Sequence, residues 1–312
     1  MADKEMRAVL AEGLTAMMQA NENIVVIDAD LARANGTLAL HNIFPDRAFD
    51  VGIAEQNMAS VAAGMASYGF IPFIGSFCPF ATRRICDQIA ISISYTKSNV
   101  KIIGTDPGAT AEVNGGTHMS VEDIGVIRSI PGIVIFEPVD NVQLAAALPQ
   151  IVDYNGPVYL RLFRKVIANV FDPANFQFDL FGSNTIKEGE DVTVFASGIM
   201  VHESLKAVQE LEKQGVSAEL INIHTIKPID AKTIVASAKK TRAVVTAENH
   251  NVVGGLGSAV AEVLSRECPT VQSYVGIPDR FGEVGMLPYL LETFGMTSEH
   301  IVAAALDAIA NK

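Results

Sequence analysis

Thiols are scarce in this chain of 312 residues, which contains only three cysteines. Cys78, Cys86 and Cys268 are too few and too scattered to form a disulfide framework or a cysteine-based metal site. Free thiols suit a reducing compartment, where disulfides are rare. The composition therefore excludes a small fold held together by disulfides.

Long apolar runs are also absent from the sequence. No apolar stretch reaches the roughly 18 residues that a membrane-spanning helix needs. The N-terminal residues Met1-Ala2-Asp3-Lys4-Glu5 are polar and lack the apolar segment of a signal peptide. We therefore expect a soluble, cytoplasmic protein with no membrane partner.

Positive charge is in short supply. The chain has 23 Lys and Arg residues against 35 Asp and Glu residues, so its formal net charge is −12. A protein that binds a phosphate backbone needs clustered Lys and Arg. We therefore expect no nucleic-acid partner, although a local basic pocket for a sugar phosphate is compatible with this charge.

Short β-branched runs alternate with helical periods along the chain, which is typical of parallel α/β layers. The length corresponds to two domains of about 150 residues each. We place the domains at 1–170 and 188–312 with a linker at 171–187, because Pro173 and Gly182 interrupt the rhythm there. The expected helices cover 6–19, 55–68, 79–95, 120–129 and 140–152, and the expected strands include 24–27, 100–103, 133–136, 158–160, 192–195, 218–221, 243–246 and 271–275.

Glu55 stands at the start of a small-residue helix that is almost uncharged up to Gly69. A Glu in the first turn of a helix needs no chemical role, because the helix dipole favours it by roughly 0.3–1 kcal/mol. The segment that follows, Phe70–Phe80, is expected to bring aromatic side chains to the same level of the fold. This setting favours a chemical role for Glu55.

Several motifs resemble the transketolase family in residue content and in order. They are Gly52–Met58, Ser76–Phe80, Asn114–His118, Ile130–Gly132 and the strand from Gly156 to Arg164. The resemblance runs from about Arg7 to the C-terminus and covers the later part of a full-length transketolase. It implies an α/β fold, in which a pyrimidine-binding domain with a parallel sheet flanked by helices precedes a smaller α/β transketolase C-terminal domain.

The resemblance implies an activity and two cofactors. Transketolases transfer a two-carbon ketol unit from a ketose donor, usually a sugar phosphate, to an aldose acceptor, with thiamine diphosphate and Mg²⁺. In the family, the glutamate at the position of Glu55 bonds a ring nitrogen of the cofactor's aminopyrimidine. The resemblance assigns cofactor binding to Asp30, Glu55, Phe77 and Phe80. Plain core packing is the alternative for the two Phe residues, and a turn or helix cap for Asp30.

The substrate end of the site is also assigned by the resemblance. His118 matches a histidine that contacts the sugar and can transfer a proton, so it is the second catalytic candidate beside Glu55. Arg7 and Arg164 match two arginines that hold the substrate phosphate, a task suited to the guanidinium fork. Asn114 completes the substrate-binding set. The alternatives are a surface histidine and ion pairing of the arginines in solvent.

The chain departs from the family pattern at three positions. Asn114 stands where the usual motif has Asp, and Arg83 stands where transketolases usually carry a Tyr. Asp106 stands where transketolases place a His for the substrate. A carboxylate at that position repels phosphate, so the sugar can differ from the usual pentose and hexose phosphates.

No Gly-Asp-Gly occurs in the chain. In this family, that motif and a later Asn hold the diphosphate through Mg²⁺, and a diphosphate needs a cation or backbone N–H groups to offset its charge. The resemblance therefore implies a transketolase N-terminal partner subunit that holds the diphosphate and the metal. We expect an α2β2 assembly of the two subunits and no metal site in this chain.

Two other functions fit the same motifs. One is a 2-oxoacid dehydrogenase beta subunit or a piece that resembles deoxyxylulose phosphate synthase, whose sequence at this motif is close to Asp46–Gln56. The other is a non-catalytic assembly module, because fold alone does not fix function. In the C-terminal half, Glu248–His250 and the glycine-rich 254–258 could bind an anion at a helix N-terminus, but tight strand–helix packing is the preferred interpretation.

Overall fold

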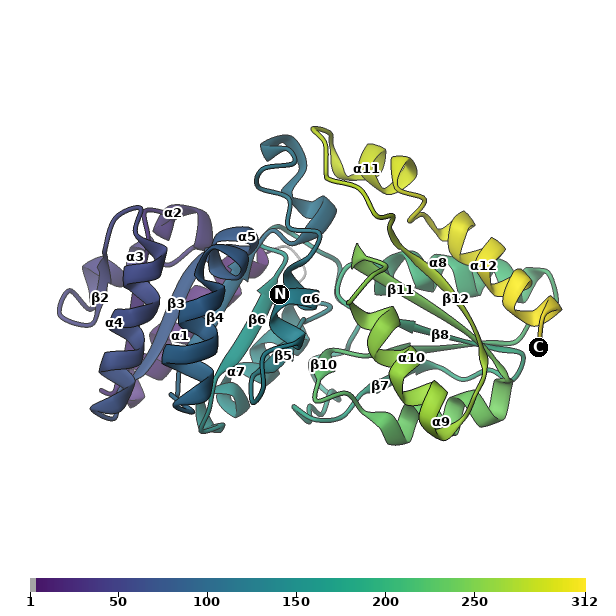
Figure 1. Ribbon diagram of the computed structural model, residues 1–312, viewed down its shortest axis with the longest axis horizontal. Helices are drawn as coiled ribbons and strands as arrows, with labels where there is room; N and C mark the ends of the chain where they lie inside the picture. Colours follow the sequence, from purple (N-terminus) through teal and green to yellow (C-terminus); the bar gives the residue numbers. More distant parts are fainter. Residues whose placement is uncertain (1–3) are drawn as a thin grey trace. The chain divides into compact units, whose positions relative to one another are not determined.

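The computed structural model describes residues 4–312, so that residues 1–3 of the polar N-terminal stretch lie outside the description (Figure 1). The chain forms two compact units. One unit holds the chain up to Pro107 together with Val126–Leu180, and the other holds Gly108–Gly125 and Phe181–Lys312. No helix within residues 4–312 is both long enough and apolar enough to cross a membrane.

The first unit contains a parallel sheet whose strands follow the order β2-β1-β3-β4-β6-β5. Strands of this kind are covered on both faces, and β1 is buried along its whole length. The strands are β1 (Ile24–Asp28), β2 (Ala48–Asp50), β3 (Ile71–Phe77), β4 (Lys101–Thr105), β5 (Val134–Phe136) and β6 (Val158–Leu162).

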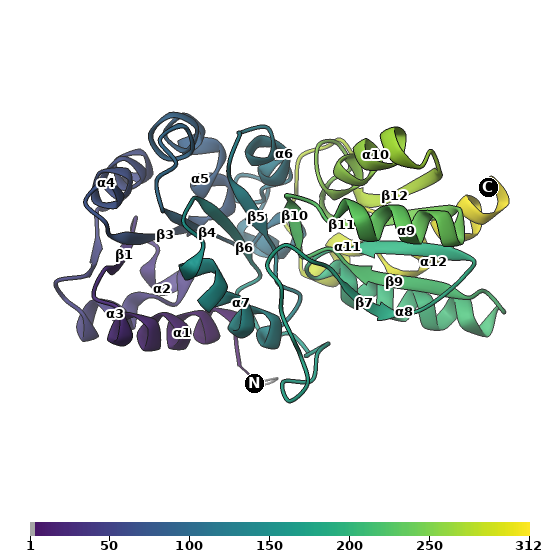
Figure 2. The same ribbon diagram turned by 90° about the horizontal axis from the view of Figure 1, so that it is seen from below.

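Helices cover both faces of this sheet. Figure 2 shows α1 (Met6–Ala20) and α7 (Asn141–Asp153) along one face and α4 (Glu55–Ser67) on the other. Apolar residues of α1 recur every three or four positions, which places them on one stripe against the sheet. The buried residues of α1 are Met6, Val9, Leu10, Leu14 and Met18. The shorter helices are α2 (Ala32–Asn35), α3 (Leu38–Ile43), α5 (Cys78–Ala81) and α6 (Asp123–Arg128).

The single helix expected over 79–95 is wrong. The structure has α5, then a 3-10 turn, η1 (Arg83–Ile85), and then a π-helix, η2 (Gln88–Tyr95). The break lies at Thr82, whose φ of −130° and ψ of −82° are not helical and whose hydroxyl donates to the Cys78 carbonyl oxygen at 2.6 Å. The helix expected over 120–129 is shorter, because α6 covers only Asp123–Arg128.

The second unit contains a sheet in the order β12-β11-β8-β9-β7, in which β7 alone among these strands runs antiparallel to its neighbour. Figure 2 shows α9 and α10 on one face of this sheet. The strands of this sheet are β7 (Asn184–Lys187), β8 (Val192–Ala196), β9 (Ala218–Asn222), β11 (Ala243–Asn251) and β12 (Val271–Ile277), while the short strand β10 (Thr225–Lys227) belongs to the same unit but not to this sheet. The helices are η3 (Gly108–Asn114), α8 (Met200–Lys213), α9 (Ala231–Thr241), α10 (Leu256–Glu267), α11 (Leu287–Thr293) and α12 (Ser298–Ala310).

Residues 108–125, which the sequence places in the first domain, pack within the second unit. The backbone N–H of Ala109 donates to the Asn249 side-chain oxygen at 2.8 Å. The N–H of Gly125 donates to His250 Nε2 at 3.2 Å. Hydrogen bonds to β11 therefore hold both ends of this segment, and they join residues more than a hundred positions apart in sequence.

The expected linker at 171–187 carries structure at both ends. Phe171 stacks on Phe176 with ring centroids 4.1 Å apart, and the Phe171 N–H donates to the Asp140 carboxylate at 2.9 Å. Leu180 is buried in the core of the first unit. The last residues of the span form β7, which pairs with β9.

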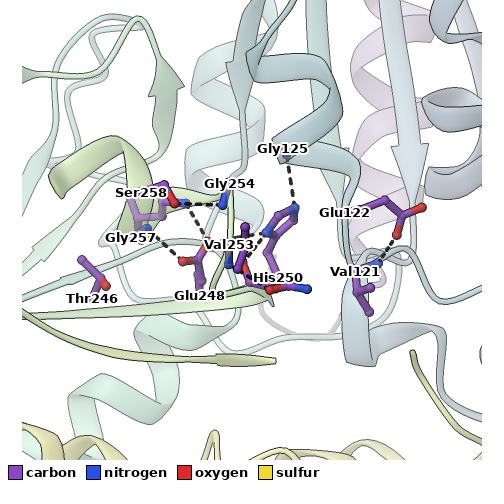
Figure 3. A network of polar contacts seen from close by, with 12 residues as sticks. Val121, Glu122, Gly125, Thr246, Glu248, His250, Val253, Gly254, Gly257 and Ser258 are labelled. Atoms are coloured by element: carbon purple, nitrogen blue, oxygen red, sulfur yellow. Dashed lines mark hydrogen bonds and ion pairs between the residues drawn. The ribbon is translucent and has the colours of Figure 1, made fainter. Parts of the chain in front are cut away.

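Glu248 on β11 holds the start of α10 (Figure 3). The backbone N–H groups of Leu256 and Gly257 donate to its carboxylate at 2.6 and 2.8 Å. A Cβ at Gly255 would lie 1.9 Å from Glu248 Oε2, so only glycine fits there. The chain's own carboxylate uses these helix-terminal donors, which supports tight strand–helix packing for this segment instead of an anion site.

We predict that Glu248→Ala lowers the free energy of unfolding by about 1–3 kcal/mol, because two buried N–H groups lose a charged acceptor. Urea unfolding of the full chain measures this loss. Glu267→Ala is the matched control, since Glu267 is exposed at the other end of α10, where a negative charge gains nothing from the helix dipole. Equal stabilities of the two variants would contradict the capping role of Glu248.

Candidate active site

The candidate residues of the first unit follow the carboxyl ends of its parallel strands. Asp30 follows β1, Glu55 follows β2, Phe80 follows β3, Asp106 follows β4 and Arg164 follows β6. Parallel strands end at the same edge of a sheet, and ligands of open α/β sheets bind outside that edge. The topology therefore gathers residues that are far apart in sequence.

Glu55 is the first residue of α4, and its side chain is only 4% exposed. Arg84 lies against it, with its Nη1 at 2.6 Å from Glu55 Oε1. A surface pocket of about 600 Å³ opens beside this ion pair. The pocket is lined by Ile53, Ala54, Glu55, Gln56, Asn57 and Arg84.

Arg84 also covers an aromatic ring. Its guanidinium carbon lies 3.8 Å from the centroid of Phe80, which is a cation–π contact. One planar group therefore rests on the Phe80 face and donates to the Glu55 carboxylate. The sequence singled out Arg83 in this region and missed Arg84, because the backbone break at Thr82 turns the later arginine toward α4.

The two phenylalanines of the Ser76–Phe80 motif meet at an angle. Their ring centroids are 6.4 Å apart and the rings are tilted by 54°. Phe77 is buried at the end of β3 and carries the Arg164 guanidinium 5.2 Å from its centroid. Phe80 is the ring whose face lies next to Glu55, through Arg84.

Asp106 and Arg164 form a second ion pair at the same edge. Arg164 Nε lies 2.6 Å from Asp106 Oδ2, and the Asp106 side chain is 2% exposed. Neither oxygen of Asp106 has an aligned hydrogen bond within residues 4–312. Burial raises the pKa of Asp106 to about 6, although the charges of Arg164 and Lys165 oppose the rise. Asp106 is therefore a buried carboxylate that Arg164 compensates only in part.

Arg7 lies beside this pair. Its backbone N–H donates to the Arg164 carbonyl oxygen at 3.1 Å. Its side chain binds Glu5 through Nε at 2.7 Å and the Ala34 carbonyl oxygen through Nη1 at 3.3 Å. The structure thus brings Arg7 and Arg164 together, and Glu5 offsets the charge of Arg7.

Asp30 adopts a left-handed backbone conformation with φ of 64°. Its backbone N–H donates to both carboxylate oxygens of Asp50 at 3.0 Å. Its own side chain is exposed. The backbone of Asp30 therefore forms a turn, which is one of the two roles expected from the sequence. Its exposed carboxylate lies after the carboxyl end of β1.

Asn114 and His118 belong to the second unit. Asn114 is exposed at the end of η3, and His118 is half-buried in the turn that follows. His118 Nδ1 lies 2.9 Å from the Thr117 hydroxyl, and the His118 backbone N–H donates to the Gly115 carbonyl oxygen at 3.0 Å. These contacts fix the ring of His118 within its own turn.

Comparison with known proteins decides the family. Residues 2–168 match the transketolase pyrimidine binding domain, and residues 183–301 match the transketolase C-terminal domain. The chain belongs to the transketolase family. This confirms the expected family and the expected fold class.

The relatives include separate transketolase subunits. A 6-deoxy-6-sulfo-D-fructose transketolase subunit of Clostridium sp. (strain MSTE9) is 51% identical over 94% of this chain and 91% of its own. A putative transketolase C-terminal section of Methanocaldococcus jannaschii is 37% identical over 97% of this chain and 96% of its own. A solved split-gene transketolase, described as an inactive beta4 tetramer, superposes with a TM-score of 0.90 at 42% identity and covers 98% of this chain and 99% of its own.

A further polar group of this transketolase-family chain was missed by sequence reasoning. Asp28, buried at the end of β1, accepts hydrogen bonds from Asn35 at 3.1 Å and Thr37 at 2.7 Å and lies 3.0 Å from His41 Nε2. Burial raises the pKa of Asp28, and these hydrogen bonds work against the rise. A charged residue at the end of an apolar strand was the available signal. Within residues 4–312 no group of His, Cys, Asp or Glu is arranged to hold a metal ion.

We predict a pH-dependent stability cost from Asp106. Its pKa is about 6 in the folded chain against about 4 in an unfolded chain. Between about pH 4 and pH 6 the folded state therefore binds more protons than the unfolded state. The free energy of unfolding is highest below about pH 4 and falls as pH rises through about 6. Asp106→Asn should raise the free energy of unfolding by about 1–2 kcal/mol at neutral pH and by little near pH 4. Urea unfolding across pH measures the difference.

Asp46→Asn is the control for this series, because Asp46 is exposed in a loop of the same unit. It should show no pH-dependent gain. A loss of stability in Asp106→Asn at neutral pH would mean that the ion pair with Arg164 outweighs the burial of the carboxylate.

Proposed function

We propose that this chain is one subunit of a thiamine diphosphate-dependent transketolase, a glycolaldehyde transferase that needs an N-terminal partner subunit. The observation that carries the proposal is the shared position of Glu55 and Phe80 around one planar group. The Arg84 guanidinium is flat and carries N–H donors on its edge, as an aminopyrimidine ring does. Its contacts support a planar ligand that lies on the Phe80 face and reaches the Glu55 carboxylate.

The candidate residues of the first unit would bind the aminopyrimidine end of the cofactor. Glu55 holds a hydrogen bond to a ring nitrogen of the aminopyrimidine, and Phe80 stacks on the ring while Phe77 supports it. Asp30 faces the cofactor from the end of β1. When bound, thiamine diphosphate supplies a thiazolium that stabilises a carbanion, and the protein supplies orientation and electrostatics.

The substrate would meet the remaining candidates. Arg164 and Arg7 bind the charged end of the sugar, since arginine suits anions with several oxygens. His118 serves proton transfer at a sugar hydroxyl, which is within the ordinary chemistry of histidine. Asn114 contributes a hydrogen bond beside it. The donor is a ketose and the acceptor an aldose.

The diphosphate and Mg²⁺ are assigned to the partner subunit, because the chain carries no Gly-Asp-Gly. Four large apolar side chains of this unit, Ile53, Tyr68, Ile91 and Tyr95, are exposed, which supports a partner here. These side chains lie next to or within α4 and η2, so the partner would cover the helices that carry Glu55 and follow Arg84. We propose an α2β2 assembly.

We predict that the isolated chain binds thiamine diphosphate weakly and converts no ketose. Without the partner, the contacts proposed for the diphosphate and Mg²⁺ are missing. Calorimetry of the isolated chain with Mg²⁺ and the cofactor measures the binding. Light scattering measures the assembly, for which we expect self-association of the isolated chain and two copies of each subunit in the active complex. Tight cofactor binding by the chain alone would refute the two-subunit proposal.

We predict that Glu55→Gln slows hydrogen–deuterium exchange at the thiazolium carbon by about 10²–10⁴-fold in the assembled complex, the usual worth of positioned acid–base catalysis. This exchange reports cofactor activation without any sugar. Glu22→Gln, at an exposed position between α1 and β1, is the control and should exchange as the parent does. If Glu55 only benefits from the helix dipole, both variants will exchange at the parental rate.

A further inference from the structure

The Asp106–Arg164 pair points to the charge of the substrate, an inference that rests on the proposed function. Arg164 is the proposed contact for the charged end of the sugar. Asp106 pairs with Arg164 Nε, and the Phe77 ring covers one face of the guanidinium. Among the described residues, these contacts leave the terminal amino groups of Arg164 as donors to a ligand. An anion bound there lies close to Asp106.

The negative charge of Asp106 is poorly screened, because the side chain is buried. Its side chain is 2% exposed, so water screens it poorly. The positive groups near it are Arg164 and Lys165. Arg7 adds a third cation next to Arg164, but its charge is engaged by Glu5 at 2.7 Å. The site therefore combines three cations, Arg164, Lys165 and Arg7, with the two carboxylates of Asp106 and Glu5, which leaves one positive charge to spare.

Ligand anions differ in how much compensation they need. A phosphate monoester carries a charge of about −1.5 to −2 near neutral pH, because its second pKa is about 6. A sulfonate has the same tetrahedral arrangement of oxygens but carries a single negative charge. The one spare positive charge of the site can neutralise the sulfonate, whereas the second charge of the phosphate faces the Asp106 carboxylate without compensation.

We propose that Asp106 is a specificity-determining residue, which makes the site select a sugar with a monoanionic end group, such as a sulfonate, over a sugar phosphate. Its carboxylate forms an ion pair with Arg164 Nε and repels a second negative charge. The relative from Clostridium sp., a 6-deoxy-6-sulfo-D-fructose transketolase subunit, agrees with this direction.

The test uses the assembled enzyme with its cofactors, one aldose acceptor and two donors, 6-deoxy-6-sulfofructose and fructose 6-phosphate. The parent should show the higher kcat/KM with the sulfonate. Asp106→Asn keeps the shape and the left-handed backbone but removes the charge. It should shift the donor ratio toward the phosphate by about ten- to a hundredfold, mainly through a lower KM for the phosphate, because like charges placed together cost several kcal/mol.

Two controls separate charge from structure. Asp46→Asn should leave the ratio unchanged. Methanesulfonate and methyl phosphate serve as inhibitors with one and nearly two negative charges near pH 7.5, and Asp106→Asn should tighten inhibition by the phosphate more than by the sulfonate. A purely structural role for Asp106 would alter both donors and both inhibitors equally.

The outcomes distinguish this inference from the proposed function. Turnover of both donors with the same ratio in the parent and Asp106→Asn would overturn the role of Asp106 and leave the transketolase activity standing. A parent that prefers the phosphate would also overturn it. No turnover of any ketose by the assembled complex would overturn the proposed function, and the selectivity would fall with it.

Discussion

Parallel pairing of β1, β3, β4 and β6 is the constraint on which the site of the first unit depends. Every one of these strands ends at the same edge, so the segments that follow them must lie beside one another. Hydrogen bonds along the strands fix the register, and helices on both faces keep the sheet buried. Glu55, Phe80, Asp106 and Arg164 thus become neighbours although the sequence separates them by up to about a hundred positions.

The two buried carboxylates at this edge are compensated in different ways. A buried charge is costly unless it is paired. Glu55 is paired with Arg84, whose side chain is 42% exposed, whereas Asp106 is paired with Arg164, which is 17% exposed. Because Arg84 is exposed, water can replace its contact with Glu55 when the two side chains separate. Glu55 is therefore the carboxylate that can change partners, and Asp106 is the one that stays with Arg164.

Much of the fold followed from the sequence, because hydrophobic period and strand composition are local signals. The fold class, the eight strands β1, β4, β5, β6, β8, β9, β11 and β12, and α1, α4 and α7 correspond to the expected elements, whereas β2, β7 and β10 were not expected. The broken helix after Phe80 did not follow, since propensity does not indicate the non-helical backbone at Thr82 or the hydrogen bond from its hydroxyl to the Cys78 carbonyl oxygen. The same holds for residues 108–125, which hydrogen bonds to distant residues of β11 hold in the second unit.

The candidate site was predictable as far as motifs reach. The resemblance pointed to Glu55 and Phe80, and the structure places both around one planar group. The group itself, Arg84, was missed, because its contact with Glu55 spans 29 positions and depends on the break at Thr82. The network around Asp28 was missed for a similar reason, as hydrogen bonds between side chains leave no periodic trace in a sequence.

We propose that the aminopyrimidine of the cofactor replaces Arg84 between Glu55 and Phe80. A crystal structure of the assembled two-subunit complex with thiamine diphosphate and Mg²⁺ is the decisive measurement. We expect the Glu55 carboxylate within hydrogen-bonding distance of a ring nitrogen, the ring stacked on Phe80, and Arg84 away from both. A bound cofactor with Glu55 and Arg84 still paired at 2.6 Å would rule this replacement out.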